Sequence, residues 1–136
     1  MKVKGFKNFV AEPGSFGKFP VIQQGDNPLA GWSDNEPIAD ANKYVLFGDH
    51  TLSLYKPNSP FLVTSDGIKI FFANGLDRDF FYYLLQRYKP NSEGYKRHYS
   101  ILKKTSCYLP KNLLEQKQIG VFFDAIDLVI TLHQRK

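Results

Sequence analysis

The sequence contains few of the residues that form metal sites and covalent cross-links. Its 136 residues include one cysteine, Cys107, and three histidines that lie far apart along the chain. One cysteine excludes an internal disulfide and a thiolate metal cluster. The histidines have no neighbouring cysteine or acidic residue at the spacing of a zinc site. We therefore expect a protein that holds no metal and needs no other cofactor.

Long apolar runs and catalytic signature motifs are also missing. No stretch reaches the roughly 18–20 apolar residues that span a bilayer, and the basic start is not followed by the apolar stretch of a secretory signal. Neither a glycine-rich phosphate loop nor a Gly-x-Ser-x-Gly elbow occurs. These absences predict a cytoplasmic protein with no membrane partner and no enzymatic activity of its own.

The composition is that of one folded domain. Apolar residues make up 43% of the chain and charged residues 23%, which is enough for one core and one surface. This balance excludes a disordered chain, a coiled-coil rod and a two-domain enzyme.

The net charge of +5 is concentrated in one segment. Residues 86–104 carry six basic residues and one acid, a net charge of +5, whereas the rest of the chain has 12 basic and 12 acidic residues. Tyr88, Tyr95 and Tyr99 are interleaved with these cations. Because cations pair with phosphates and planar rings pack on sugars or bases, the segment predicts contact with a nucleic acid. The alternative is a solvated loop that happens to be basic.

Short β-type runs fill the first part of the chain. Residues 1–18 lack a clear periodicity and are expected to form a lead-in segment. A turn-rich loop is predicted at 24–41. Strands are predicted where β-branched and aromatic residues cluster between turn residues, at 19–23, 44–47, 51–55, 61–64, 68–72 and 105–109.

Two later segments show helical periodicity. Residues 77–87 begin with Asp77 or Asp79 as the N-cap and place apolar residues on one face. Asn112 and Glu115 resemble a capping box, after which apolar residues continue at helical spacing almost to the last residue. We therefore expect an α+β fold with a small mixed sheet, a packed helix and a long amphipathic terminal helix.

Ordered motifs along the chain carry a family resemblance. Residues 109–136 resemble the segment that follows each target recognition domain in specificity subunits of Type I restriction–modification systems, where it opens a long spacer helix. The matching residues are Leu109, Pro110, Leu114, Glu115, Gln116, Ile119, Phe122, Phe123, Asp127, Ile130 and His133-Gln134-Arg135-Lys136. Upstream motifs are similar to one subclass of these domains, namely Pro20-Val21-Ile22, Phe47-Gly48-Asp49-His50-Thr51, Gly67-Ile68-Lys69, Phe80 to Leu85 and Gly94-Tyr95-x-Arg97-His98.

The resemblance implies a domain division and a function. It divides the chain into a lead-in at 1–18, a DNA target recognition domain at 19–110 and the start of a spacer or dimerisation helix at 111–136. It implies that the chain reads one half of a bipartite duplex DNA target without catalysis. The implied partners are duplex DNA, a DNA methyltransferase (modification) subunit and a restriction/translocase subunit. A full specificity subunit resembles two such halves in tandem, and this chain corresponds to one.

Composition and resemblance together indicate which side chains contact DNA. Basic side chains are expected on phosphates, and amide or guanidinium groups on base edges. The predicted DNA-binding residues are Gln23, Gln24, Asn27, Lys69, Tyr95, Lys96, Arg97, His98, Lys103 and Lys104. Alternatives stay open for several of them. Arg97 also suits a buried ion pair with an acid such as Asp49, and His98 a place in the core. The amides of Gln23 and Gln24 also suit loop-stabilising hydrogen bonds.

The terminal helix is expected to meet another helix. Ile119, Phe122, Phe123, Ile126 and Ile130 recur at the spacing of a helical seam. The facing helix would belong to a second copy of the chain, giving a homodimer, or to the matching half of a longer subunit.

Two other functions compete with sequence-specific DNA recognition. The first is an inactive half-domain that acts only as a protein-interaction module, in which the basic segment is incidental. The second is an unspecific nucleic-acid binder, because basic loops rich in tyrosine also suit single strands.

Overall fold

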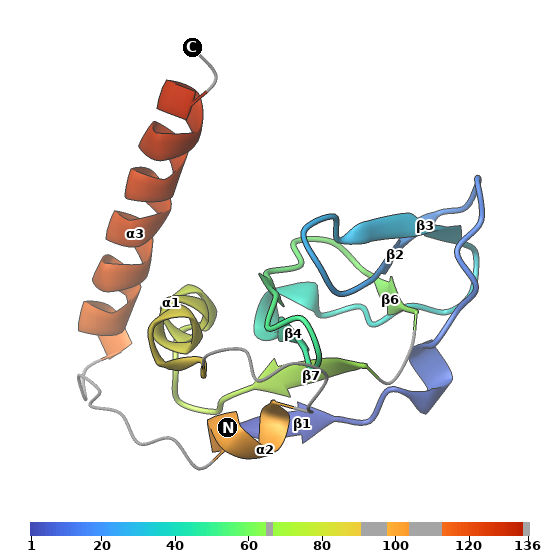
Figure 1. Cartoon of the computed structure of the whole chain (residues 1–136), viewed down its shortest axis with the longest axis horizontal. Coiled ribbons are helices and arrows are strands. Elements are labelled where there is room, and N and C mark those ends of the chain that lie inside the picture. Colours follow the sequence, from blue (N-terminus) through green and yellow to red (C-terminus); the bar gives the residue numbers. More distant parts are fainter. Residues whose placement is uncertain (65–66, 91–97, 104–112, 135–136) are drawn as a thin grey trace.

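The computed structural model describes residues 1–64, 67–90, 98–103 and 113–134, with the side chains of the last helix described as far as Asp127. Within these residues the chain forms two β-sheets and three α-helices, which confirms the α+β class (Figure 1). Short 3-10 turns at Lys7–Phe9 and Ala41–Lys43 precede β2 and β4. The elements are β1 (Lys2–Lys4), β2 (Phe19–Ile22), β3 (Leu29–Ser33), β4 (Val45–Gly48), β5 (Leu54–Tyr55), β6 (Leu62–Val63), β7 (Ile68–Phe72), α1 (Arg78–Tyr88), α2 (Tyr99–Lys103) and α3 (Leu113–Gln134).

The larger sheet is antiparallel and has the strand order β1-β7-β4-β5. Its central strand, β7, occupies the range predicted from the sequence, 68–72. Neighbouring side chains of a strand point to opposite faces. Ile70 therefore enters the cluster shared with the smaller sheet, whereas Phe71 enters the cluster beneath the helices.

The smaller sheet is mixed, because β2 pairs antiparallel with β3 and parallel with β6. One mixed sheet was predicted, and the structure has this sheet beside the antiparallel one. β3 lies inside the predicted loop at 24–41. Its central Gly31 gives no strand signal, but the N–H and carbonyl of Trp32 pair with Gly14 at 2.9 Å each. A Cβ on Gly31 would lie 2.7 Å from the Gly14 oxygen, so glycine permits this close approach.

The N-terminal segment is built into both sheets. β1 pairs along the edge of β7 and places Val3 opposite Phe71. The Ala11 N–H donates to the Val63 oxygen at 3.0 Å. The lead-in segment predicted at 1–18 is thus held by long-range pairing, which local periodicity does not reveal.

Two apolar clusters divide the interior into layers. The first lies between the sheets and contains Ile22, Leu46, Phe61 and Ile70. The second covers the opposite face of the larger sheet, where β4 and β7 meet residues of α1 and α2. The chain is therefore arranged as smaller sheet, larger sheet and helices (Figure 1).

The helices confirm some predictions and add one element. The Asp77 carboxylate caps α1 by accepting from the Phe80 N–H at 3.1 Å, as predicted. α2 was not predicted, and its first N–H, that of Tyr99, donates to Asp49 Oδ1 at 2.8 Å. The predicted strand at 105–109 and the predicted capping residue Asn112 lie outside the described residues.

α3 rests on α1 through a face of small and polar residues. The Gln116 side chain is buried and accepts from the Asp77 N–H at 3.1 Å. One turn later, a Cβ on Gly120 would lie 3.1 Å from the Phe80 nitrogen, so glycine lets the two helices approach closely. The first half of α3 is therefore held at the N-terminus of α1.

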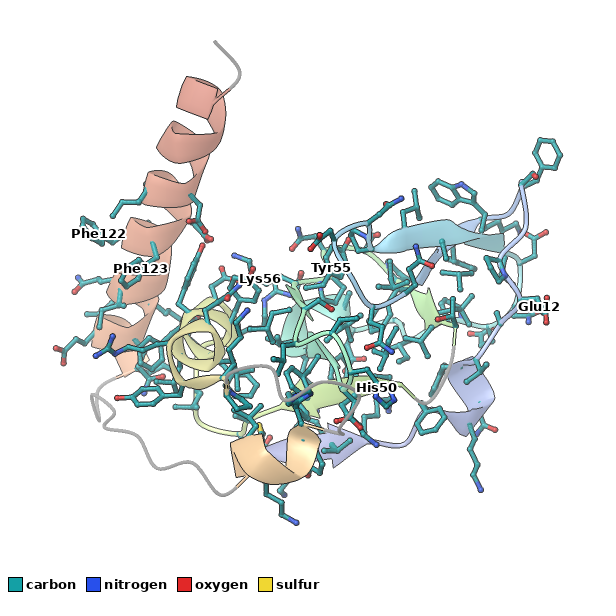
Figure 2. The ribbon with its side chains drawn as sticks, viewed as in Figure 1. Glu12, His50, Tyr55, Lys56, Phe122 and Phe123 are labelled. Carbon is teal, nitrogen blue, oxygen red and sulfur yellow. The ribbon has the colours of Figure 1, made fainter. Side chains whose placement is uncertain are left out.

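A polar network continues the same face of α3. Lys56, which follows β5 and reaches toward α1 (Figure 2), places its ammonium 2.5 Å from Asp124 Oδ1. The Tyr83 hydroxyl lies 2.6 Å from the same oxygen and 2.8 Å from Asp127 Oδ2. Burial acts to raise the pKa of Asp124, but the hydrogen bonds from Lys56 and Tyr83 outweigh it, and the pKa is lowered. Burial, followed by the two carboxylates, raises the pKa of Tyr83 and keeps its hydroxyl protonated.

Candidate nucleic-acid interface

A tight turn joins β4 to β5 and forms one side of the candidate site. The Gly48 N–H donates to the Ser53 oxygen, and the Leu52 N–H donates to the Gly48 oxygen, both at 2.8 Å. A Cβ on Gly48 would lie 2.5 Å from Ser53 Oγ and 2.8 Å from Gln24 Cβ, so only glycine fits there. The turn is thereby packed directly against the loop that follows β2.

Gln24 fastens this turn with its side-chain oxygen. Gln24 Oε1 accepts from the His50 N–H at 3.2 Å and from the Thr51 N–H and hydroxyl at 3.3 Å. Since backbone N–H groups only donate, the atom that faces them is the amide oxygen. Gln24 therefore makes the loop-stabilising bonds that the sequence left as an alternative, and its NH₂ group points elsewhere.

Gln23 closes the loop between β2 and β3. Its Nε2 donates to the Asn27 carbonyl at 2.8 Å, and the Gln23 N–H donates to the Pro28 oxygen at 2.8 Å. Because a carbonyl only accepts, the atom that faces it is the amide nitrogen. Asn27 is exposed at the tip of this loop, and its side chain makes no hydrogen bond among the described residues.

A cavity of about 310 Å³ opens beside these two glutamines. Its walls come from β2, β4, β5, the first residue of β7 and the C-terminal end of α1. The lining residues that matter below are Gln23, Gln24, Tyr55, Gln86 and Lys89. The fold thus brings two of the predicted DNA-binding residues to one hollow, together with residues the sequence did not single out.

His98 is not available to DNA, which corrects its prediction as a DNA-binding residue. Its side chain is fully buried, and its backbone N–H donates to the Asp49 oxygen at 2.9 Å. Nδ1 lies 2.9 Å from the same carbonyl, which requires Nδ1 to carry the proton. The residue therefore holds the Asp49 turn from inside, as its core alternative anticipated.

Cations gather on the helix side of the larger sheet. The Lys69 ammonium of β7 lies 5.8 Å from the ring centroid of Tyr99, the first residue of α2. Lys103 is exposed at the other end of α2, and Arg87 is exposed near the end of α1. Lys89 donates to the Leu52 oxygen at 3.3 Å. Arg87 and Lys89 belong to the predicted basic segment but were not chosen as contacts, because charge density alone does not rank its members.

Some predicted contacts cannot be placed. Tyr95, Lys96, Arg97 and Lys104 lie outside the described residues. The described part of the basic segment is its two flanks, at 86–90 and 98–103, and both lie against the same apolar cluster beneath the helices.

The smaller sheet has the opposite charge. The predicted loop at 24–41 carries four acids, Asp26, Asp34, Glu36 and Asp40, and no basic residue. Glu12, on the segment that borders β3, lies at the edge of the molecule farthest from α3 (Figure 2). Acids repel phosphates, so this loop does not supply phosphate contacts.

The terminal helix divides its predicted seam between two faces. Ile119 and Phe123 lie toward α1, and the Phe123 ring centroid is 5.2 Å from that of Tyr83. That these residues also meet a helix of a second copy or of a longer subunit stays a prediction. Phe122 is 60% exposed and points away from α1 (Figure 2). Phe123 and Ile126 are 41% and 36% exposed, and Ile126, seven residues after Ile119, lies on the same side of the helix as Ile119. The side chain of Ile130 lies outside the described ones.

The described residues offer neither a membrane-spanning helix nor a cluster of metal ligands. In the part of the chain that the structure describes, no helix is both long and apolar enough to cross a membrane. The same residues contain no group of three or more His, Cys, Asp or Glu side chains that could hold a metal ion. No protein-family model, curated protein or solved structure matches this chain.

Proposed function

We propose that the chain recognises duplex DNA and reads one half of a bipartite target for a Type I restriction–modification complex, without catalysing a reaction. The observation that carries the proposal is the polarised charge of the fold. The whole net charge of +5 lies in residues 86–104. The flank at 98–103 lies on the helix side of the larger sheet beside Lys69, and the flank at 86–90 contacts the same cluster through the bond from Lys89 to the Leu52 oxygen.

Phosphate contact is assigned to this basic side. Lys69, Arg87, Lys89 and Lys103 come from β7, α1 and α2, so they present cations from three elements at once. Lys96, Arg97 and Lys104, which lie outside the described residues, stay predicted phosphate contacts on the evidence of the sequence. Phosphate contacts fix the register on the duplex but carry no sequence information.

Base reading is assigned to the cavity and the loop beside it. Gln23 and Gln24 border it, and Asn27 stands exposed at the tip of the same loop. Neutral amides discriminate bases through donor and acceptor patterns. They can therefore read a base although the loop at 24–41 carries no basic residue. The resemblance adds the partners, a DNA methyltransferase subunit and a restriction/translocase subunit.

Selection from a random duplex pool by the purified chain tests the proposal at near-physiological salt. We expect enrichment of a motif of a few base pairs. A spaced inverted repeat would show in addition that two copies bind together through α3. Binding without an enriched motif contradicts sequence recognition and leaves unspecific binding, and no binding contradicts both.

Charge variants test the assignment of the surface. Lys69→Gln and Lys103→Gln should each make the negative slope of log binding constant against log salt less steep by about 0.9, because each removes one phosphate contact. Lys18→Gln is the matched control, since Lys18 is exposed like Lys103 but lies beside the smaller sheet. Equal slopes for all three variants contradict a basic binding side.

The acidic sheet favours a second function, protein interaction. Phe16 is 90% exposed and Trp32 is 38% exposed, and Glu12 and Asp34 lie near them in the sequence, together with Lys18. Exposed aromatic groups with an acidic rim are typical of a contact with a basic protein surface. Loss of partner binding in Phe16→Ser, with DNA binding unchanged, would identify this contact.

A further inference from the structure

Lysines from three short elements gather at the β1 edge of the larger sheet (Figure 1). In β1, Val3 lies opposite Phe71, whose side chain enters the cluster beneath the helices. Because neighbouring side chains of a strand point to opposite faces, the lysines on either side of Val3 point away from the helices. One further lysine begins the first 3-10 turn, and another ends the second. These four edge lysines are Lys2, Lys4, Lys7 and Lys43.

Aromatic rings position two of the edge lysines. The Lys4 ammonium lies 5.4 Å from the ring centroid of Phe9 and 5.8 Å from that of Tyr44. The Lys43 ammonium lies 5.8 Å from the Tyr44 centroid and 4.8 Å from the Phe72 centroid. Tyr44 is buried and meets Phe72 edge to face at 5.9 Å between centroids. Attraction to the ring faces therefore holds both cations around one buried tyrosine.

The positive charge of the edge lysines is not neutralised by the described part of the chain. The ion pairs described there involve Lys56 and Arg78, and no edge lysine forms an ion pair or donates a side-chain hydrogen bond to a described residue. Residues 1–11 contain three lysines and no acid. Asp40 is exposed, and its Oδ2 accepts from the Tyr44 hydroxyl at 3.5 Å. The ammonium groups therefore keep their hydrogen-bond donors for an anion from outside.

Protection of a sheet edge explains only part of this arrangement. Lysines on an edge strand discourage pairing with another chain, which accounts for the two lysines of β1. Lys43 belongs to a different element and still meets the same rings as Lys4. Since like charges repel, grouped cations without a counter-charge weaken a fold. Their grouping is better explained by binding to a polyanion.

The edge lysines adjoin the surface to which phosphate contact is assigned. β1 pairs with β7, the strand that carries Lys69. Phe71 of β7 lies 5.5 Å from Tyr99 between ring centroids, and Lys69 lies over that same tyrosine. The two groups of cations are thus on opposite faces of two neighbouring strands, which are about 4.8 Å apart in a sheet. Positive charge therefore continues around this edge from one face to the other.

We propose that the edge lysines bind the sugar–phosphate backbone of a DNA duplex, as a second phosphate-contact surface around the β1 edge. The inference rests on the proposed function for the identity of the polyanion. Phosphates are the same at every base pair, so these contacts carry no sequence information. The edge lysines add affinity and salt dependence without changing the motif that is read.

The salt dependence of binding by the full chain tests the inference, with the duplex from the pool selection and a mixed-sequence duplex as probes. Lys4→Gln and Lys43→Gln should each make the negative slope of log binding constant against log salt less steep by about 0.9, equally for both duplexes. Lys18→Gln, which changes an exposed lysine beside the smaller sheet, is the matched control and should keep the slope. Lys43→Arg keeps the charge and the attraction to the rings, so it should also keep the slope.

Circular dichroism of each variant shows whether it folds. Lys4 is half-buried and Lys43 is exposed, so Lys43→Gln decides the test where Lys4→Gln disturbs folding. If Lys43→Arg changes the slope as much as Lys43→Gln does, charge is not the reason for the effect and the inference is wrong.

The remaining outcomes separate this inference from the proposed function. If a motif is enriched and neither Lys4→Gln nor Lys43→Gln changes the slope, the inference is wrong and DNA recognition stands. If no motif is enriched but the mixed-sequence duplex binds with slopes that depend on both lysines, sequence recognition is wrong and the inference stands. If no duplex binds, both are wrong. Binding of polyglutamate that depends on both lysines, with unchanged duplex slopes, overturns the inference and assigns the edge lysines to an acidic protein.

Discussion

The two faces of α3 make opposite use of their residues. The face toward α1 contains Gln116, Gly120, Asp124 and Asp127, which are polar or small, together with Ile119 and Phe123. The outward face carries Val121 and Phe122, which are apolar and 67% and 60% exposed, beside the exposed polar residues Lys117 and Gln118. A globular helix ordinarily places its apolar residues against its own core. Here two large apolar side chains stay in solvent.

On the inner face, which is the face toward α1, polar residues are enough to hold α3 in place. Its glycine allows close approach, its buried amide accepts from the start of α1, and its carboxylates meet Lys56 and Tyr83. Satisfied hydrogen bonds at close range replace apolar area as the source of specificity. We propose that Val121 and Phe122, on the outward face, contact a second copy of the chain.

The largest effect is expected where the helices approach most closely. In Gly120→Val, the branched side chain would be forced against the Phe80 nitrogen and Asp79 Cβ, which lie 3.1 and 3.2 Å from the place that a Cβ on residue 120 would occupy. We expect the free energy of unfolding, measured by urea titration, to fall by about 1–3 kcal/mol. Gly120→Ala is the graded control, since a gain in helix propensity of up to about 1 kcal/mol offsets its smaller clash. If valine is tolerated as well as alanine, close approach does not hold this face.

This contact also marks the limit of prediction from sequence. β7, α1 with its Asp77 cap, and α3 were predicted because each carries a local signal of period, cap or turn. β1 and β3 were not predicted. β1 has three residues, of which two are lysines, and β3 has five residues around Gly31, and both become strands only by pairing with distant segments of the chain. A local sequence pattern does not show which distant segment a strand pairs with.

The candidate site follows the same rule. The basic segment was visible as a count of charges, and the amides Gln23 and Gln24 were chosen for their chemistry. These amides line one cavity with Tyr55 and Lys89 because of the way β2, β5 and α1 pack. The spacing of residues along the sequence does not predict that packing. The contact of Ile119 and Phe123 with α1 was not predicted, because apolar periodicity identifies a face of a helix without identifying what that face meets.

A smaller effect is expected from the charged part of the inner face. Asp124→Asn removes the carboxylate that pairs with Lys56, and we expect a loss of roughly 1 kcal/mol at pH 7, a value reduced by the partial exposure of Asp124. Because the folded pKa of Asp124 is lowered, its contribution is complete above the ordinary aspartate pKa of about 3.9 and is lost as the pH falls through the lowered value. The difference between the two chains in urea titrations should therefore shrink at acid pH. Glu36→Gln, an exposed acid without an ion pair among the described residues, is the control and should show no such convergence.

The smallest effect on stability is expected on the outward face, where the effect on assembly should be largest. Phe122 is 60% exposed, and its main ring neighbour is Phe123, at 5.7 Å between centroids. Phe122→Ser should change the free energy of unfolding of the monomer by less than about 0.5 kcal/mol, as surface substitutions do. Sedimentation should show the unaltered chain forming dimers as its concentration rises, and the variant remaining monomeric. A monomeric unaltered chain at every concentration would contradict a second copy as the occupant. A strong loss of monomer stability would instead place Phe122 among the residues that dock α3, and the contrast between the two faces would no longer hold.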